Sequence, residues 1–163
     1  MARVGVVLSS PPFVEGGHLV LARELVRALR AEGHEADLLV TPQNRFGRQG
    51  AAYLATWLTD VGVGADGRAI DQVISLRYPA FAVRHPRHVC WLTHLMREYY
   101  DRWDAFSATL SPANRVKEGL RRRLMHAADG YCLRRHVQQR FVIAGVVQRR
   151  LQRWSGLPSE VLH

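Results

Sequence analysis

Two adjacent glycines, Gly16 and Gly17, separate an apolar segment at residues 4–8 from a stretch with helical periodicity. Glycine allows the backbone to turn tightly, and the first turn of a helix offers N–H groups without intrahelical partners. A strand, a glycine loop and a helix in this order can bind an anion such as a phosphate. A tight turn without a ligand has the same pattern, so both interpretations stay open.

Further polar residues follow other apolar segments of the chain. Arg77 and Tyr78 come after residues 72–76, and His94 comes after residues 88–92. In a parallel sheet the carboxyl ends of the strands lie at one edge, where ligands bind. We therefore expect these side chains to lie near Gly16 and Gly17.

The elements that position these residues follow from periodicity. Residues 4–8, 18–32 and 36–41 predict a strand, an amphipathic helix and a second strand, with Gly33 ending the helix. Later apolar and periodic segments continue the alternation, with strands at 72–76, 88–92, 140–144 and 160–162 and helices at 51–58, 113–137 and 145–154. This order predicts a doubly wound α/β fold with a mostly parallel sheet and helices on both faces.

Length and composition indicate one Rossmann-like domain over residues 1–163. The chain is 47% hydrophobic and 23% charged, without an apolar run of the roughly 20 residues that span a bilayer. The apolar segment after Met1-Ala2-Arg3 is too short for the core of a signal peptide. We expect a cytoplasmic protein.

Metal binding is not expected. Cys90 and Cys132 lack C-x-x-C spacing, and His85 and His88 lack the spacing of zinc ligands. We expect two buried free thiols, no metal ion and no other cofactor.

The net charge is +9, and it is concentrated in the C-terminal half. Between Arg115 and Arg153, the basic residues are opposed only by Glu118 and Asp129. Such a field attracts phosphorylated small molecules, anionic lipid headgroups or nucleic acid. Without a nucleic-acid motif, nucleic acid is the least favoured of these partners, and a solvated helix face explains the charge equally well.

From Arg77 onward, the chain contains residues whose order and spacing are typical of one protein family. The residues concerned are Arg77-Tyr78-Pro79, His85-Pro86, Val89, Trp91-Leu92, His94, Arg97, Tyr100-Asp101, Trp103, Phe141-Val142-Ile143, Arg149-Arg150-Leu151, Gly156 and Glu160-Val161-Leu162. In order and spacing they resemble the N-terminal domain of family 4 glycosyltransferases of the GT-B fold. The resemblance covers essentially the whole chain.

The resemblance implies a transferase built from two Rossmann-like domains. Such enzymes transfer a sugar from a nucleotide-sugar donor to an acceptor with retention of anomeric configuration. Only the first domain matches these residues, so a C-terminal donor-binding domain is expected in cis or in trans. We expect residues 1–163 alone to be inactive, because the base and ribose of the donor find no partner.

Site residues follow from the same resemblance. Gly16 and Gly17 match the glycine loop that lies against the donor diphosphate, and His94 matches a histidine near the reacting sugar. Contacts to the acceptor are expected from His18, Arg77, Tyr78, Arg97 and Tyr100. His94 bonded to a loop carbonyl, and Arg97 and Tyr100 packed in the structure, are the alternatives.

Ala144 departs from the pattern, because the family usually has serine there. A hydroxyl at this position could contact a substrate or cap the following helix. The lack of a hydroxyl at Ala144 favours an alternative function. In this alternative the chain is a non-catalytic module, or a subunit of a split glycosyltransferase, and it binds a phosphorylated ligand, an anionic membrane or a protein partner. Peripheral attachment to the inner face of a membrane is compatible with both.

An independent nucleotide-binding enzyme with a flavodoxin-like or Rossmann fold is the third hypothesis. No G-x-G-x-x-G follows the first strand. This argues against a dinucleotide site.

Overall fold

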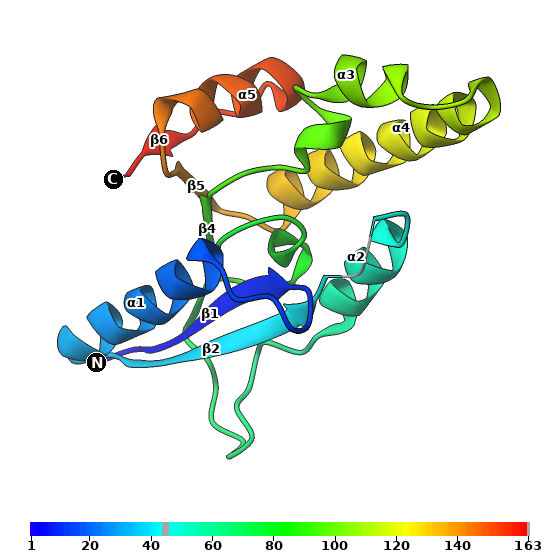
Figure 1. Ribbon diagram of the computed structural model, residues 1–163. Helices are drawn as coiled ribbons and strands as arrows, with labels where there is room; N and C mark the ends of the chain where they lie inside the picture. Colours follow the sequence, from blue (N-terminus) through cyan, green and yellow to red (C-terminus); the bar gives the residue numbers. More distant parts are fainter. Residues whose placement is uncertain (44–45, 163) are drawn as a thin grey trace.

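The computed structural model describes residues 1–43 and 46–162, which form one parallel sheet with helices around it (Figure 1). The order of the strands is β2-β1-β3-β4-β5-β6. The strands are β1 (Arg3–Ser10), β2 (Glu35–Pro42), β3 (Gln72–Ser75), β4 (His88–Leu92), β5 (Gln139–Val142) and β6 (Glu160–Val161). The helices are α1 (Gly17–Ala31), α2 (Gln49–Leu58), α3 (Trp103–Ala108), α4 (Pro112–Arg135) and α5 (Gly145–Ser155), with short 3-10 turns η1 (Ala80–Ala82) and η2 (Arg97–Tyr99).

Strand β1 is buried on both faces of the sheet. Val6 and Leu8 pack with α1, whereas Val7 lies in a second cluster that includes Val61 and Val73. Successive side chains of a strand point to opposite faces, so a nearly continuous apolar run is what a doubly covered strand requires. The predicted doubly wound α/β class is confirmed.

Helix α1 packs its apolar stripe on β1 and β2. Leu19, Ala22 and Val26 are buried at helical spacing, and Gly33 follows the helix with a φ of +82°. Side chains other than glycine rarely adopt this left-handed conformation, so Gly33 ends the helix as predicted. The preceding loop leaves the N-terminus of α1 at the carboxyl end of β1.

Helix α4 is the longest element, and it covers the core of the second half of the chain. Pro112 occupies its first turn, and the Ser111 hydroxyl accepts a hydrogen bond from the Asn114 N–H. Met125 and Leu133 pack there with residues of β4 and β5. Cys90 and Cys132 are buried free thiols, as predicted.

The direction of the connections reverses between β1 and β3. The chain runs from β1 outward to β2, then returns to β3 on the other side of β1 and continues toward β6. In open parallel sheets, ligands bind outside the carboxyl ends of the strands at such a reversal. The topology therefore places the expected site where β1 and β3 end.

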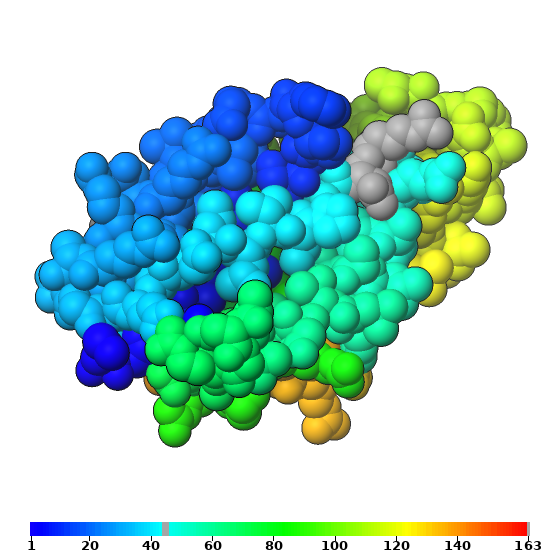
Figure 2. All heavy atoms as spheres, turned by 90° about the horizontal axis from the view of Figure 1, so that it is seen from below, coloured from blue at the N-terminus to red at the C-terminus, as the bar shows by residue number. Residues whose placement is uncertain are grey.

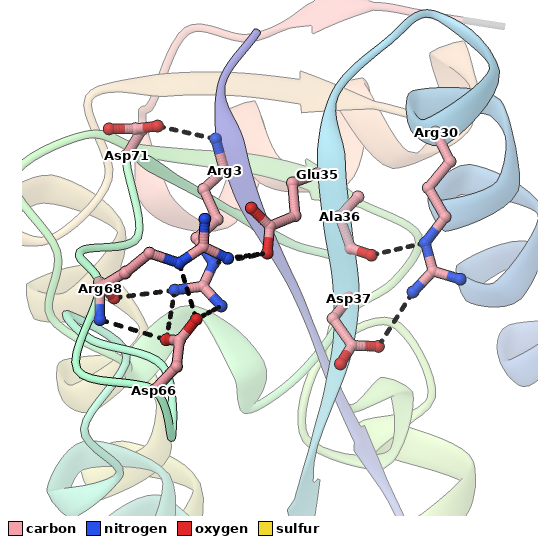
Figure 3. Close-up of polar contacts among 8 residues, drawn as sticks. All are labelled: Arg3, Arg30, Glu35, Ala36, Asp37, Asp66, Arg68 and Asp71. Atoms are coloured by element: carbon pink, nitrogen blue, oxygen red, sulfur yellow. Dashed lines mark hydrogen bonds and ion pairs between the residues drawn. The ribbon is translucent and has the colours of Figure 1, made fainter.

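Charged side chains at the opposite edge of the sheet form a closed network (Figure 3). The Arg3 guanidinium bonds both carboxylate oxygens of Asp66, and Arg68 bonds Asp66 and Glu35. Asp71 accepts a hydrogen bond from the Arg3 N–H at 2.7 Å. These contacts hold the loop before β3 against the amino ends of β1 and β2.

Two segments differ from the sequence prediction. The region after β4 contains η2 and α3, where the sequence indicated only a helical start near Leu95. Strand β5 ends at Val142, two residues earlier than predicted, and Ala144 is the N-cap of α5. None of the helices in the described ranges is long and apolar enough to cross a bilayer.

Candidate functional site

A cavity of about 520 Å³ lies at the carboxyl edge of the sheet, beyond β2, β3 and β4. It is lined by Gln43, Phe46, Arg77, Tyr78, His94, Leu95, Met96, Arg97 and Glu98. The parallel sheet brings Arg77 and His94 together there, because β3 and β4 are neighbours whose carboxyl ends lie at the same edge of the sheet, β4 extending two residues further. This confirms the position that the strand pattern predicts for them.

Arg77 is the central charge of the cavity. It lies between the buried residues Leu76 and Tyr78, just after β3, and burial lowers the pKa of its guanidinium. Within residues 1–43 and 46–162, its Nε is buried without a hydrogen-bond partner and no carboxylate pairs with it. A partly buried guanidinium without a counter-charge is unfavourable by itself, so it is poised to bind an anion.

His94 lies beside Arg77, and one of its ring nitrogens has no hydrogen-bond partner among the described residues. Its Nδ1 is 3.1 Å from the Leu95 carbonyl oxygen, which can only accept, so Nδ1 carries the proton. Burial and the charge of Arg77 lower the pKa of the ring, which is therefore neutral at pH 7. The bond to a loop carbonyl that the alternative, structural interpretation of His94 holds is present, and it leaves the Nε2 lone pair to accept a proton or a hydrogen bond.

The glycine loop lies beside this cavity without lining it. Gly16 is the N-cap of α1, and Gly17 is its first residue. His18, in the first turn, has its Nε2 3.0 Å from the Ser10 hydroxyl. Burial and then the charge of Arg77 lower the pKa of His18, which places this ring within the field of the cavity.

The site thus combines a buried cation with a helix N-terminus. Arg77 carries full charge, and the unpaired N–H groups of α1 add the positive end of a helix dipole. Burial, and after it the charge of Arg77, lowers the pKa of both His18 and His94. This arrangement can bind a phosphate or diphosphate and can take or give a proton next to it.

The structure does not bring every predicted residue to the cavity. Tyr100 is buried in the core, and its hydroxyl donates a hydrogen bond to Asp129. It packs, as the alternative interpretation holds, and an acceptor contact from its hydroxyl is not supported by this placement. Tyr78 lines the cavity with its buried ring while its hydroxyl lies against the Met125 sulfur.

Arg97 stays at the exposed rim of the cavity. Its guanidinium pairs with Asp101 at 3.1 Å, and Arg150 pairs with the same carboxylate at 2.9 Å. Arg97 is therefore partly neutralised. It is a weaker candidate for anion binding than Arg77.

Three polar residues in or next to the site were not predicted from sequence: Gln43, Thr93 and Glu98. Gln43, after β2, and Thr93, after β4, have buried side-chain oxygens without a partner among the described residues. Their position directly after apolar strands was the available signal, and it is the signal that identified Arg77 and His94. Gln43 and Glu98 line the cavity, whereas Thr93 does not.

A second cavity, of about 680 Å³, lies at the amino edge of the sheet. Arg3, Glu35 and Asp66 line it, and Figure 3 shows that they are bonded to one another. Their charges are already satisfied, so this cavity has less need of an ionic ligand than the one at Arg77. Nowhere in the described part of the chain do three or more His, Cys, Asp or Glu side chains gather as metal ligands.

Comparison with known proteins does not assign the site. No protein-family model matches the chain, and no curated protein matches it significantly. The chemistry of the site therefore has to be argued from its own residues.

Proposed function

We propose that residues 1–163 form the acceptor-side half of a retaining glycosyltransferase that uses a nucleotide-sugar donor. The observation that carries the proposal is Arg77, a partly buried guanidinium at the carboxyl edge of the sheet that forms no ion pair among the described residues, although Glu98 lines the same cavity. His94 lines the same cavity, and His18 in the first turn of α1 lies close enough for the charge of Arg77 to act on its ring. The motif order from Arg77 to Trp103, which resembles this class of enzyme, supports the same assignment.

In this proposal the chain positions the donor and stabilises the leaving group. Arg77 and the N–H groups of α1 face the negative charge that develops on the diphosphate as the bond to the sugar breaks. Neutral His94 accepts a hydrogen bond at Nε2 from a sugar hydroxyl. No metal ion is required for these roles, since Arg77 supplies the positive charge.

A second domain is part of the proposal, either on the same polypeptide or on a separate one. The cavity at Arg77 has an exposed rim, so a donor bound to this chain alone keeps its base and ribose in water. Affinity and orientation would then be insufficient for turnover.

The activity test compares residues 1–163 alone with the same residues joined to a donor-binding half. UDP-, GDP- and ADP-glucose are the donors, nucleoside diphosphate release is the readout, and NMR gives the anomeric configuration of the product. We expect acceptor-dependent release with retention from the joined protein and none from residues 1–163. Efficient transfer by residues 1–163, or inversion of configuration, would contradict the proposal.

A non-catalytic binding module is the second candidate, and Ala144 favours it. Ala144 is the N-cap of α5 and offers no side-chain hydrogen bond to the helix or to a ligand. A module of this kind would bind pyrophosphate at Arg77 and show no transfer in either form of the protein.

A further inference from the structure

A row of apolar side chains lies on the solvent side of α4. Val116, Leu120, Leu124 and Tyr131 keep 76, 61, 58 and 51% of their surface exposed. At 3.6 residues per turn these positions fall on one face of the helix, opposite Met125 and the other core-facing residues. The row is about 22 Å long at 1.5 Å per residue.

Helix α2 extends this row into a wider apolar surface. A groove of about 600 Å³ between α2 and α4 is lined mainly by apolar side chains, among them Leu54, Trp57, Leu124 and Tyr131. The rings of Trp57 and Tyr131 stack with centroids 5.7 Å apart. Figure 2 shows α2, in teal, beside α4, in yellow. We call this surface, formed by Leu54, Trp57, Val116, Leu120, Leu124 and Tyr131, the α2–α4 face.

The charged residues that border the row on α4 are all cations. Lys117 and Arg135 lie on one side of it and Arg123 on the other, all exposed and without a carboxylate partner in the described parts of the chain. The acidic residues of α4, Glu118 and Asp129, are both buried. Glu118 is also bonded to Arg121 and Tyr99. The burial of both carboxylates cannot be seen in the sequence. It leaves the exposed side of α4 apolar and positively charged.

We propose that the α2–α4 face docks on the surface of a membrane that contains anionic lipids. A helix with an apolar row between basic residues lies in the interface, with the apolar row among the acyl chains and the cations at the headgroups. A second copy of the chain suits this face less well, because a symmetric contact would bring Lys117, Arg123 and Arg135 against their own equivalents. The inference stands apart from sugar transfer and is tested without it.

The face and the cavity at Arg77 are separate surfaces. Tyr78 lies between them: it lines the cavity, its ring packs on Tyr53 with centroids 5.4 Å apart, and its hydroxyl bonds Met125. Substitutions of exposed residues on α4 should therefore leave anion binding at Arg77 unchanged.

Co-sedimentation with lipid vesicles tests the inference. We expect the chain to bind vesicles of phosphatidylcholine mixed with phosphatidylglycerol, to bind phosphatidylcholine alone weakly, and to lose binding as salt is raised. The double variant Leu120→Ser/Leu124→Ser should lower the partition coefficient roughly tenfold or more, because it removes buried hydrocarbon from the interface. Lys117→Glu/Arg123→Glu should lower binding to the anionic vesicles by a similar factor.

Matched controls come from α1, which carries exposed residues of the same kinds. Val20→Ser and the double variant Arg23→Glu/Arg27→Glu should bind the anionic vesicles as the unaltered chain does. Equal binding to neutral and anionic vesicles, or equal losses in the α1 and α4 variants, would overturn the inference. So would a dimer, detected by light scattering, that Leu120→Ser/Leu124→Ser dissociates while the unaltered chain binds no vesicles.

Discussion

Arg77 is the residue on which the site depends. The burial that prepares its guanidinium to bind an anion also destabilises the folded protein. Desolvation lowers the pKa of its guanidinium, and no carboxylate pairs with it among residues 1–43 and 46–162. Burying a polar group without partners costs on the order of 1–3 kcal/mol. Binding residues that destabilise the free protein are expected where a ligand supplies the missing charge.

Replacing this guanidinium by an apolar chain of similar length should therefore stabilise the protein. We expect Arg77→Met to raise the free energy of unfolding by roughly 1 kcal/mol, because the unpaired charge and its orphaned Nε disappear. Urea unfolding followed by circular dichroism measures the change. Arg97→Met, which removes an already paired guanidinium at the rim, is the control and should not stabilise. A clear loss of stability in Arg77→Met would show that Arg77 is a structural residue.

His94 is expected to act in transfer more than in folding. In the protein joined to a donor-binding half, His94→Ala should lower kcat roughly 100-fold or more, as loss of a proton-transfer or hydrogen-bonding group does. The free energy of unfolding should change by less than about 1 kcal/mol, because the ring is partly exposed and has one hydrogen bond to a carbonyl. Steady-state kinetics and urea unfolding of the same preparations separate the effects. Matching losses in both would make His94 a packing residue.

His88 makes the fold sensitive to acid. Its ring, on the first residue of β4, is buried with Nε2 2.8 Å from the Ser75 hydroxyl of β3, and burial lowers its pKa from 6.5 to about 4. The unfolded chain therefore takes up a proton at a higher pH than the folded one. Stability from the neutral ring is complete above pH 6.5 and falls as the pH drops toward 4, by roughly 3 kcal/mol in total.

The variant His88→Gln, whose amide can still reach Ser75, should flatten this dependence. Between pH 6.5 and 4.5, the free energy of unfolding should fall less steeply in the variant, by about 1.4 kcal/mol per pH unit. Urea unfolding of the variant and of the unaltered chain at several pH values gives the pH dependence of each free energy of unfolding. A loss of stability that is the same at every pH does not change these slopes. Identical slopes would mean that His88 does not titrate in this range.

Among the elements, α5 begins without a cap. Ala144 has the extended backbone of an N-cap, with φ −159° and ψ 155°, and no side-chain hydrogen bond to the first turn. Ala144→Ser should raise the free energy of unfolding by about 0.5–2 kcal/mol through a bond to a free N–H of α5. Thermal and urea unfolding provide the measurement, and Ser111→Ala, which removes the cap of α4, should lower stability by a similar amount. If Ala144→Ser is neutral or destabilising, capping of α5 does not explain a serine at this position.

The regular elements could be predicted from the sequence because their signals are local. Helix α1 shows its buried stripe and its terminal Gly33, and the strands are apolar runs between breaking residues. Arg77 and His94 could be brought together because strands of a parallel sheet end at one edge. The segment from Leu95 to Ser111 could not be read in this way, since its short turns are set by aromatic packing among Tyr99, Trp103 and Phe106.

Periodicity also fails where a helix has two apolar faces. Residues of α4 recur at helical spacing both toward the core, as at Met125 and Leu133, and toward solvent, as at Leu120 and Leu124. Sequence alone does not say which face is buried. It also does not show that the Tyr100 hydroxyl donates a hydrogen bond to Asp129. The sequence therefore predicts that Tyr100 contacts the sugar acceptor, although its hydroxyl is hydrogen-bonded inside the core.

For the molecule as a whole, the two edges of the sheet differ in the way their charges are balanced. At the amino edge, Arg3 and Arg68 are bonded to Glu35 and Asp66. At the carboxyl edge, Arg77 has no such partner in the described part of the chain, and a helix N-terminus lies nearby. With a net charge of +9 the chain favours anions generally, so the test of the account is where an anion binds.

Titration of the isotope-labelled chain with inorganic pyrophosphate, followed by amide NMR, tests this most directly. The account predicts weak binding that shifts the amides of Gly16, Gly17, Arg77 and His94, and loss of these shifts in Arg77→Met, which stays folded. Shifts that centre on Arg3 at the amino edge, or that persist unchanged in Arg77→Met, would contradict it.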